Sequence, residues 1–296
     1  MRNRSHRRGQ DSAAQFSASD ALDVARVCSV GGLLGESVAM QALFERIARA
    51  ASTQASVLIV GESGSGKELT ARCLHELSAR ADQPFLVFNC GALPPSLIEP
   101  ELFGREAGGS PDSTLTHFVS QQGYLERAGE GTLLLEEVPE LAPDVQLKLL
   151  RVLESGRMTR VGASQEWEVR CRVMATMQRD AHASRLRPEL LDRLSICTIA
   201  VPPLREREED AALLAHYFLA VLNAEEGTSK KFSGASLHCL RQHPWPGNVR
   251  ELRNAVHRAF ILADGDLDLA AALDKPLTLS SNGDGQVLRI PVGTPL

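Results

Sequence analysis

The sequence predicts an α/β fold, in which helices flank both faces of a parallel sheet, followed by a small α-helical domain. Three observations support this prediction. Short apolar strands alternate with amphipathic helices over the first two thirds of the 296 residues, an order typical of parallel sheets. A glycine-rich loop joins one of these strands to a helix. After Pro202-Pro203 the strand pattern stops and three helical segments follow.

The spacing of apolar residues predicts the individual elements. Apolar side chains recur at helical spacing in residues 38–50 and predict a helix there. Residues 144–154 show the same spacing, with Val145, Leu149, Val152 and Leu153 on one face. Runs of four to eight apolar residues bounded by turn residues indicate buried strands. Strands are expected at 56–60, 85–88, 131–138, 169–176 and 196–201, and further helices at 67–79, 144–154, 208–223, 233–242 and 248–262.

These elements divide the chain into four predicted segments. Residues 1–28 form a polar arm, 29–205 an α/β domain, 206–273 a helical domain and 274–296 a linker-like tail. The tail contains the segment Ser280-Ser281-Asn282-Gly283-Asp284-Gly285, which is typical of linkers.

Composition and charge exclude several other classes of protein. Hydrophobic residues make up 43% and charged residues 23%, as in globular proteins. No apolar run approaches the roughly 18 residues of a membrane helix, and no secretory signal is found, so we expect a cytoplasmic protein without a membrane partner. The net charge of −5 argues against non-specific binding of nucleic acid. The six cysteines and eight histidines lack metal-ligand spacing.

The strongest motif is the glycine-rich loop at residues 61–67, with the pattern Gly-x4-Gly-Lys. Glycines let backbone N–H groups turn toward a bound phosphate, and the helix that follows adds the positive end of its dipole. Lys67 is placed to reach the β- and γ-phosphates of a nucleotide. The next residue is usually Ser or Thr, whose hydroxyl binds magnesium, but here it is Glu68. The predicted nucleotide-binding residues of this segment are Gly61, Glu62, Ser63, Gly64, Ser65, Gly66, Lys67 and Glu68.

An acidic pair follows the apolar run at residues 133–135. Glu136 is expected to hold Mg²⁺ together with the ATP phosphates. Glu137 is expected to act as the general base on the attacking water. Two acids after an apolar strand are common and are weak evidence by themselves. Because a phosphate loop lies about seventy residues earlier, the pair becomes strong evidence for a nucleotide site.

Together these motifs resemble the AAA+ ATPase domain of sigma-54-dependent transcriptional activators, also called bacterial enhancer-binding proteins. The segment ending at Glu68 is close to that family's GESGTGKE, in which glutamate also follows the lysine. The resemblance spans residues 32–264 and implies an AAA+ fold with a helical lid. Further matching blocks are FNC at 88–90, ELFG at 101–104, GTLLL at 131–135, KLLRVL at 148–153, PPLRER at 202–207 and WPGNVREL at 245–252.

The resemblance also implies an activity and roles for individual residues. The family forms rings, usually hexamers, that use ATP and Mg²⁺ to remodel RNA polymerase holoenzyme containing sigma-54. By this resemblance, Asn89 restrains the catalytic Glu137 until ATP is sensed. Arg187 and Arg193 are arginine fingers offered to a neighbouring subunit, where they would stabilise charge developing on the γ-phosphate. Arg250 is the sensor arginine of the lid.

The sequence departs from the family at three places. Glu136 stands where the family has Asp, and a catalytic group misplaced by about 1 Å can cost about a hundredfold in rate. The GAFTGA loop that contacts sigma-54 is missing, since residues 105–114 read REAGGSPDST. The sensor strand ends Ala-Thr-Met-Gln rather than Ala-Thr-Asn, so the sensor is either Gln178 or, after a register shift, Thr176.

Two hypotheses follow. In the first, the chain hydrolyses ATP in a ring and remodels the sigma-54 holoenzyme. In the second, it is an ATP-binding regulatory subunit with weak or no hydrolysis that does not remodel sigma-54. In either case we expect contact with DNA only through a missing domain or another chain.

Overall fold

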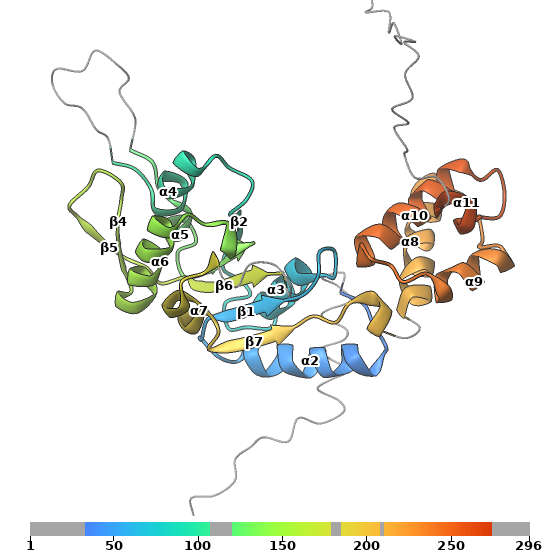
Figure 1. Ribbon diagram of the computed structural model, residues 1–296, viewed down its shortest axis with the longest axis horizontal. Helices are drawn as coiled ribbons and strands as arrows, with labels where there is room; N and C mark the ends of the chain where they lie inside the picture. Colours follow the sequence, from blue (N-terminus) through green and yellow to red (C-terminus); the bar gives the residue numbers. More distant parts are fainter. Residues whose placement is uncertain (1–32, 107–119, 179–184, 208–209, 274–296) are drawn as a thin grey trace, which may run out of the picture.

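A computed structural model describes residues 33–106, 120–178, 185–207 and 210–273. Its centre is a five-stranded parallel sheet in the order β2-β3-β6-β1-β7 (Figure 1). The α/β prediction is confirmed, and each of the five expected strands is present. The strands are β1 (Val57–Val60), β2 (Phe85–Asn89), β3 (Thr132–Glu136), β6 (Arg172–Met177) and β7 (Cys197–Ala200).

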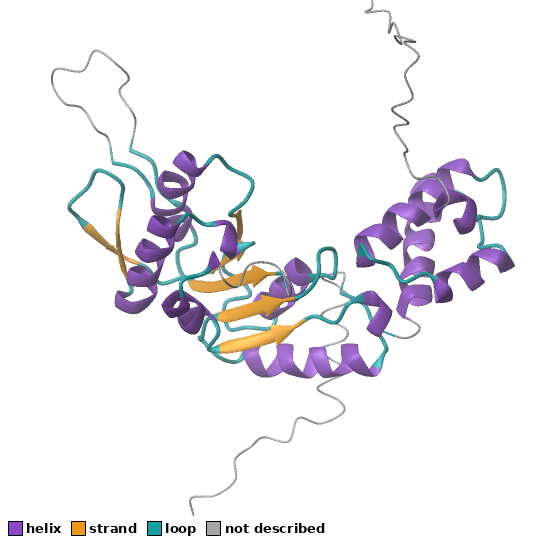
Figure 2. Cartoon of the chain, viewed as in Figure 1, coloured by secondary structure: helices purple, strands orange, loops and turns teal. Residues whose placement is uncertain are grey.

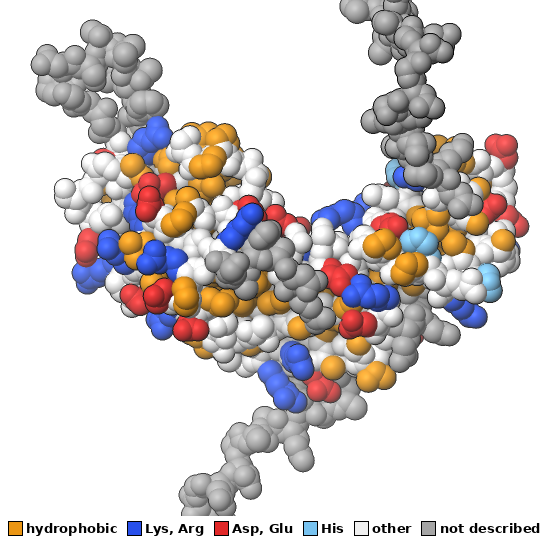
Figure 3. Space-filling model, in the orientation of Figure 1, with side chains coloured by type: hydrophobic (Ala, Val, Ile, Leu, Met, Phe, Trp, Pro, Cys, Tyr) orange, Lys and Arg blue, Asp and Glu red, His pale blue; other side chains and the backbone are white. Residues whose placement is uncertain are grey.

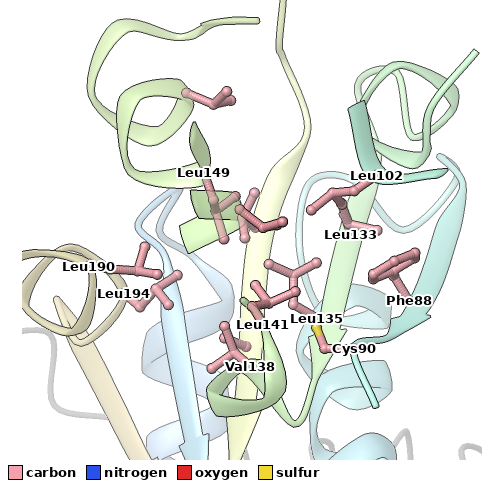
Figure 4. Close-up of a cluster of buried hydrophobic side chains, with 14 of the residues drawn as sticks. Phe88, Cys90, Leu102, Leu133, Leu135, Val138, Leu141, Leu149, Leu190 and Leu194 are labelled. Atoms are coloured by element: carbon pink, nitrogen blue, oxygen red, sulfur yellow. The ribbon is translucent and has the colours of Figure 1, made fainter. Parts of the chain in front are cut away.

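Two hydrophobic clusters cover the two faces of the sheet, because successive side chains of a strand point to opposite faces. Leu133 and Leu135 belong to one cluster, together with Phe88 and Leu149 (Figure 4). Leu134, between them, belongs to the other cluster. The three consecutive leucines therefore mark a strand buried on both sides, as expected for a parallel sheet.

Helices cover these faces. The first face packs against α6 (Pro143–Ser155) and α7 (Pro188–Leu194), whose buried leucines appear in Figure 4. The second face packs against α2 (Val38–Ala51) and α3 (Lys67–Glu76). The remaining elements of this part are α4 (Pro95–Phe103), α5 (Tyr124–Arg127), the 3-10 turns Val138–Glu140 and Leu204–Glu206, and an antiparallel hairpin of β4 (Arg157–Thr159) and β5 (Glu166–Glu168).

A separate cluster of buried residues holds together the last four helices, which we call the lid helices. Trp245 and Leu252 lie at its centre, each 1% exposed or less. Figure 2 shows strands confined to the α/β part and the lid built from helices and loops. The lid helices are α8 (Asp210–Glu226), α9 (Gly234–Gln242), α10 (Asn248–Leu262) and α11 (Leu269–Leu273).

Several expected boundaries are wrong by two or three residues, among them the end of α8, which lies at Glu226 rather than at 223. The strand expected from residue 169 begins at Arg172, because the N–H of Val169 donates to the carbonyl of Gly156 in the hairpin rather than to a sheet strand. The helix expected to reach residue 79 ends at Glu76, where the hydroxyl of Ser78 donates to the carbonyl of His75. The strand expected to reach residue 138 ends at Glu136, and a 3-10 turn follows.

Some expectations fall outside the described residues. They include the polar arm, the tail, and most of the segment where the GAFTGA loop would lie. Within the described residues, no helix combines the length and the apolar character that crossing a membrane requires.

Candidate functional site

The carboxyl ends of the parallel strands bring the predicted site residues to one edge of the sheet. The glycine-rich loop follows β1 and leads into α3, while Asn89 ends β2. Glu136 ends β3, Glu137 follows it, and Gln178 comes directly after β6. In open α/β sheets this edge is where ligands bind.

The phosphate loop requires glycine at two of its positions. Gly64 and Gly66 have φ values of 73° and 105°, a region that other residues rarely enter. A side chain at position 64 would also collide with the carbonyl oxygen of Gly247, which lies against the place of its Cβ. The loop is therefore shaped by its glycines and closely packed against the start of α10.

Lys67 lies over its own loop in this structure. Its ammonium donates to the carbonyl oxygens of Gly61 and Glu62, both at 3.0 Å. Burial lowers the pKa of Lys67, and the nearby charge of Arg250 lowers it further, whereas Glu137 acts in the opposite direction. The ammonium thus sits in a half-buried position between one basic and several acidic groups.

Glu137 is held in an unusual backbone conformation. Its φ is 54°, in the left-handed region that a glutamate enters only when its surroundings impose it. The backbone N–H of Glu137 donates to the hydroxyl of Thr176 at 3.1 Å, and Gln178 Nε2 approaches its carboxylate at 3.4 Å. Both sensor candidates therefore contact Glu137: Thr176 holds its backbone and Gln178 its carboxylate.

Asn89 contacts the first residue of the acidic pair. Its amide Nδ2 donates to Glu136 Oε2 at 3.4 Å, and its Oδ1 accepts from the N–H of Gly91. The reason lies in the register, because Asn89 on β2 is paired directly with Glu136 on β3. Its restraint of Glu137 stays a prediction.

Glu136 has an excess of negative charge around it. Burial raises the pKa of Glu136 most, and the carboxylates of Glu68 and Glu137 raise it further. Glu68 also lies 3.3 Å from Arg72, one helical turn along α3. In the part of the chain that the structure describes, no group of three or more His, Cys, Asp or Glu side chains is placed to hold a metal ion. Mg²⁺, a hard cation that prefers carboxylate oxygens and is usually bound by one or two carboxylates plus phosphates, would therefore bind here through Glu136 together with the nucleotide.

The lid reaches the phosphate loop through the predicted sensor arginine. Arg250 Nη1 donates to the hydroxyl of Ser63 at 2.8 Å. A cavity of about 330 Å³ lies beside this contact and is lined by Ser63, Arg250, Asn254 and Arg258 among others. Figure 3 shows acidic and basic side chains beside the hollow between the α/β part and the lid.

We call the phosphate loop, the acidic pair Glu136-Glu137 and Arg250 together the cradle. Arg187 and Arg193 lie apart from the cradle and contact α6 instead. Arg193 Nη2 donates to the carbonyl of Leu153 at 2.9 Å, and the backbone N–H of Arg187 donates to Gln146 Oε1 at 2.9 Å. Figure 1 shows α7 on the side of the sheet away from the lid. Their role as fingers for a neighbouring subunit stays a prediction.

Three residues that contact the phosphate loop had no predicted role. Asn248 donates to Glu62 and to the carbonyl of Ser63, Arg205 forms a bidentate ion pair with Glu62, and Arg207 donates to a loop carbonyl. They belong to the blocks PPLRER and WPGNVREL, which were noted only as matching blocks.

Comparison with known proteins identifies related chains. Residues 33–200 match the family described as the sigma-54 interaction domain, and residues 205–286 match the AAA+ ATPase lid domain. The Nif-specific regulatory protein of Azotobacter vinelandii is 40% identical over 237 residues, covering 78% of this chain and 44% of that protein. The regulatory protein AtoC of Escherichia coli is 40% identical over 268 residues, covering 89% and 57%. The chain thus spans about half the length of these relatives.

Solved structures agree with this relationship. The crystal structure of NtrX from Brucella abortus in complex with ATP superposes with a TM-score of 0.71 at 32% identity. The match covers 85% of this chain and 59% of NtrX.

Proposed function

Because the chain belongs to the sigma-54 interaction domain family and carries an AAA+ lid, we propose that it binds Mg-ATP at the phosphate loop and hydrolyses it in a ring of subunits. We further propose that the ring, a hexamer, acts on RNA polymerase holoenzyme containing sigma-54. One observation carries the proposal: Lys67, the adjacent pair Glu136 and Glu137, and Arg250 come from three segments of the chain and converge on one cradle. The NtrX complex with ATP supports nucleotide binding at such a cradle.

Each residue of the cradle has a proposed task. The loop N–H groups and Lys67 bind the phosphates, and Lys67 exchanges its two carbonyl contacts for phosphate oxygens. Arg250 leaves Ser63 for the γ-phosphate. Glu136 holds Mg²⁺, which when bound offsets the charge of the phosphates.

The hydrolytic step uses Glu137. A water oxygen attacks the γ-phosphorus, the bond from phosphorus to the β,γ-bridging oxygen breaks, and the proton of the water passes to the Glu137 carboxylate. Thr176 holds the backbone of Glu137, and Gln178 holds its carboxylate. Arg187 and Arg193 of a neighbouring subunit stabilise the charge that develops on the transferred group.

The test of this proposal is Mg-ATP turnover by the wild-type protein and by Glu137→Ala. Loss of the general base is expected to reduce kcat by about 10²–10⁴-fold, while ATP affinity stays within about threefold of wild type. Phosphate release and ATP binding, measured on the same preparations, separate the two effects. Equal turnover in the two proteins would refute the role of Glu137.

Glu136 favours the second function, a regulatory subunit that binds ATP with weak or no hydrolysis. Its side chain is one methylene longer than the aspartate of the family. The extra methylene moves the carboxylate away from the position that fast hydrolysis requires. Tight ATP binding without measurable turnover in the wild-type protein would select this function over the first.

Glu136→Asp is expected to raise turnover by about tenfold to a hundredfold, because it restores the shorter side chain at the metal position. Steady-state kcat for Mg-ATP is the measurement. Glu154→Asp, the same change at an exposed position on α6, is the matched control and should leave kcat unchanged. A kcat for Glu136→Asp equal to or below wild type would show that the extra methylene does not limit the rate.

A further inference from the structure

We propose that Asn248, the first residue of α10, is a positioning residue that holds the phosphate loop in its anion-binding shape before nucleotide arrives. The inference rests on the proposed function, because it assigns a role at the same site. Asn248 is fully buried and lies at the junction of three segments that are distant in sequence. Its Nδ2 donates to Glu62 Oε2 and to the carbonyl of Ser63, both at 3.1 Å, and its Oδ1 accepts from the N–H of Leu204 at 2.7 Å.

The carbonyl groups of the phosphate loop show why this matters. The first two, of Gly61 and Glu62, accept from Lys67, and that of Glu62 also accepts from the N–H of Ser65 at 3.3 Å. The next three accept from outside the loop, as follows: Ser63 from Asn248, Gly64 from the N–H of Val249 at 3.1 Å, and Ser65 from the guanidinium of Arg207.

In a trans peptide the carbonyl and the following N–H point in opposite directions. Donors that hold the carbonyls on the outside of a loop therefore turn its N–H groups toward the inside, which is the arrangement that binds phosphate. Lys67 leaves its carbonyls when it binds nucleotide, whereas the donors from Asn248, Val249 and Arg207 lie outside the loop and can stay. These three contacts thus preserve the loop shape through the cycle.

Asn248 also fixes the side chain of Glu62. That carboxylate receives Asn248 Nδ2 at one oxygen and the two guanidinium nitrogens of Arg205 at 2.6 and 2.8 Å. One buried amide therefore ties the loop to the segment before the lid and to the first turn of α10. A movement of the lid relative to the sheet would be transmitted directly to the loop.

The backbone of Asn248 explains why this residue type is needed. Its φ of 54° lies in the left-handed region, which Asn, Asp and Gly tolerate better than other residues. Among these three, only Asn both donates to the loop and accepts from Leu204. Asp keeps the shape and the acceptor but replaces the donor with an oxygen that faces the Glu62 carboxylate and the Ser63 carbonyl.

Asn248→Asp is therefore expected to weaken ADP binding by at least about tenfold, the size of one lost hydrogen bond to a charged group. Adding Glu62→Gln supplies an amide that can donate to the carboxylate introduced at position 248. It is expected to recover part of the affinity relative to the Glu62→Gln single variant, because the contact with the Ser63 carbonyl stays lost. ADP dissociation constants by calorimetry and thermal melting for the four proteins complete the cycle. A merely structural role would lower the melting temperature while the folded variants bound ADP as tightly as their references.

Two further variants keep the outcomes distinct. Lys67→Ala serves as the reference: if it loses ADP while Asn248→Asp binds as tightly as wild type, the positioning role is overturned and the nucleotide site stands. Normal ADP binding by Lys67→Ala would instead overturn the proposed function. If thermal melting shows that Asn248→Asp is unfolded, Asn248→Gly replaces it, because glycine tolerates the same φ and adds no charge. The Asn248→Gly protein should bind ADP more weakly than wild type, and wild-type affinity would overturn the inference. A loss of affinity in Asn248→Asp that Glu62→Gln does not rescue would also overturn it.

Discussion

Lys67→Ala is expected to reduce ATP affinity by at least about a hundredfold. The substitution removes the ammonium that would bind two phosphate groups, and a hydrogen bond to a charged group contributes about 1.5–3 kcal/mol. Two such contacts correspond to roughly two to four powers of ten in the dissociation constant. The variant also removes the donor that the carbonyls of Gly61 and Glu62 share in the free protein, and only Glu62 keeps another, the N–H of Ser65.

Calorimetry with Mg-ATP measures this effect, with Lys231→Ala as the matched control. Lys231 is exposed and lies between α8 and α9, away from the phosphate loop. The Lys231→Ala protein should bind ATP with wild-type affinity. If Lys67→Ala also bound ATP with wild-type affinity, the assignment of residues 61–67 as the nucleotide site would be refuted.

Arg193→Ala is expected to reduce turnover by about 10³–10⁵-fold, the contribution of an arginine finger, with little change in ATP affinity. Arg193 donates to the carbonyl of Leu153 and makes no described contact with the cradle of its own chain. Its proposed site of action is therefore the cradle of a neighbouring subunit. Arg187→Ala is expected to act in the same direction.

A mixture of two inactive variants tests whether the arginine acts between subunits. A Glu137→Ala subunit still carries Arg193 and can present it to an Arg193→Ala subunit whose Glu137 is intact. Mixing the two should therefore restore part of the turnover. Arg170→Ala, which removes an exposed arginine paired with Glu168 and Glu130, is the control and should keep full activity. Full turnover by Arg193→Ala alone would contradict the finger assignment.

Local sequence patterns predicted the strands and the phosphate loop well because their causes are local. The run of leucines at 133–135 alternates between the two faces of the sheet, and the strand-loop-helix order around Lys67 places backbone N–H groups by short-range geometry. The parallel sheet then places the acidic pair beside the loop, because both lie at the carboxyl ends of parallel strands. This part of the site followed from the sequence and the order of its elements.

Contacts between distant segments could not be predicted in this way. The bond from Asn248 to Glu62 joins residues separated by 186 positions, and the register that places Asn89 opposite Glu136 is set by pairing between strands. The helix α4 was missed because Pro100 lies inside it and local propensity argues against a helix there. The β4–β5 hairpin was missed because each of its strands has only three residues, too few to show a period.

The most direct test of the account is Mg-ATP turnover per subunit across a range of protein concentrations, with Glu137→Ala as control. If arginines of one subunit complete the site of the next, turnover per subunit rises as subunits assemble, reaches a plateau, and is absent in the control. Turnover that is the same per subunit at every concentration, including those where sedimentation shows monomers, would contradict a site shared between neighbours.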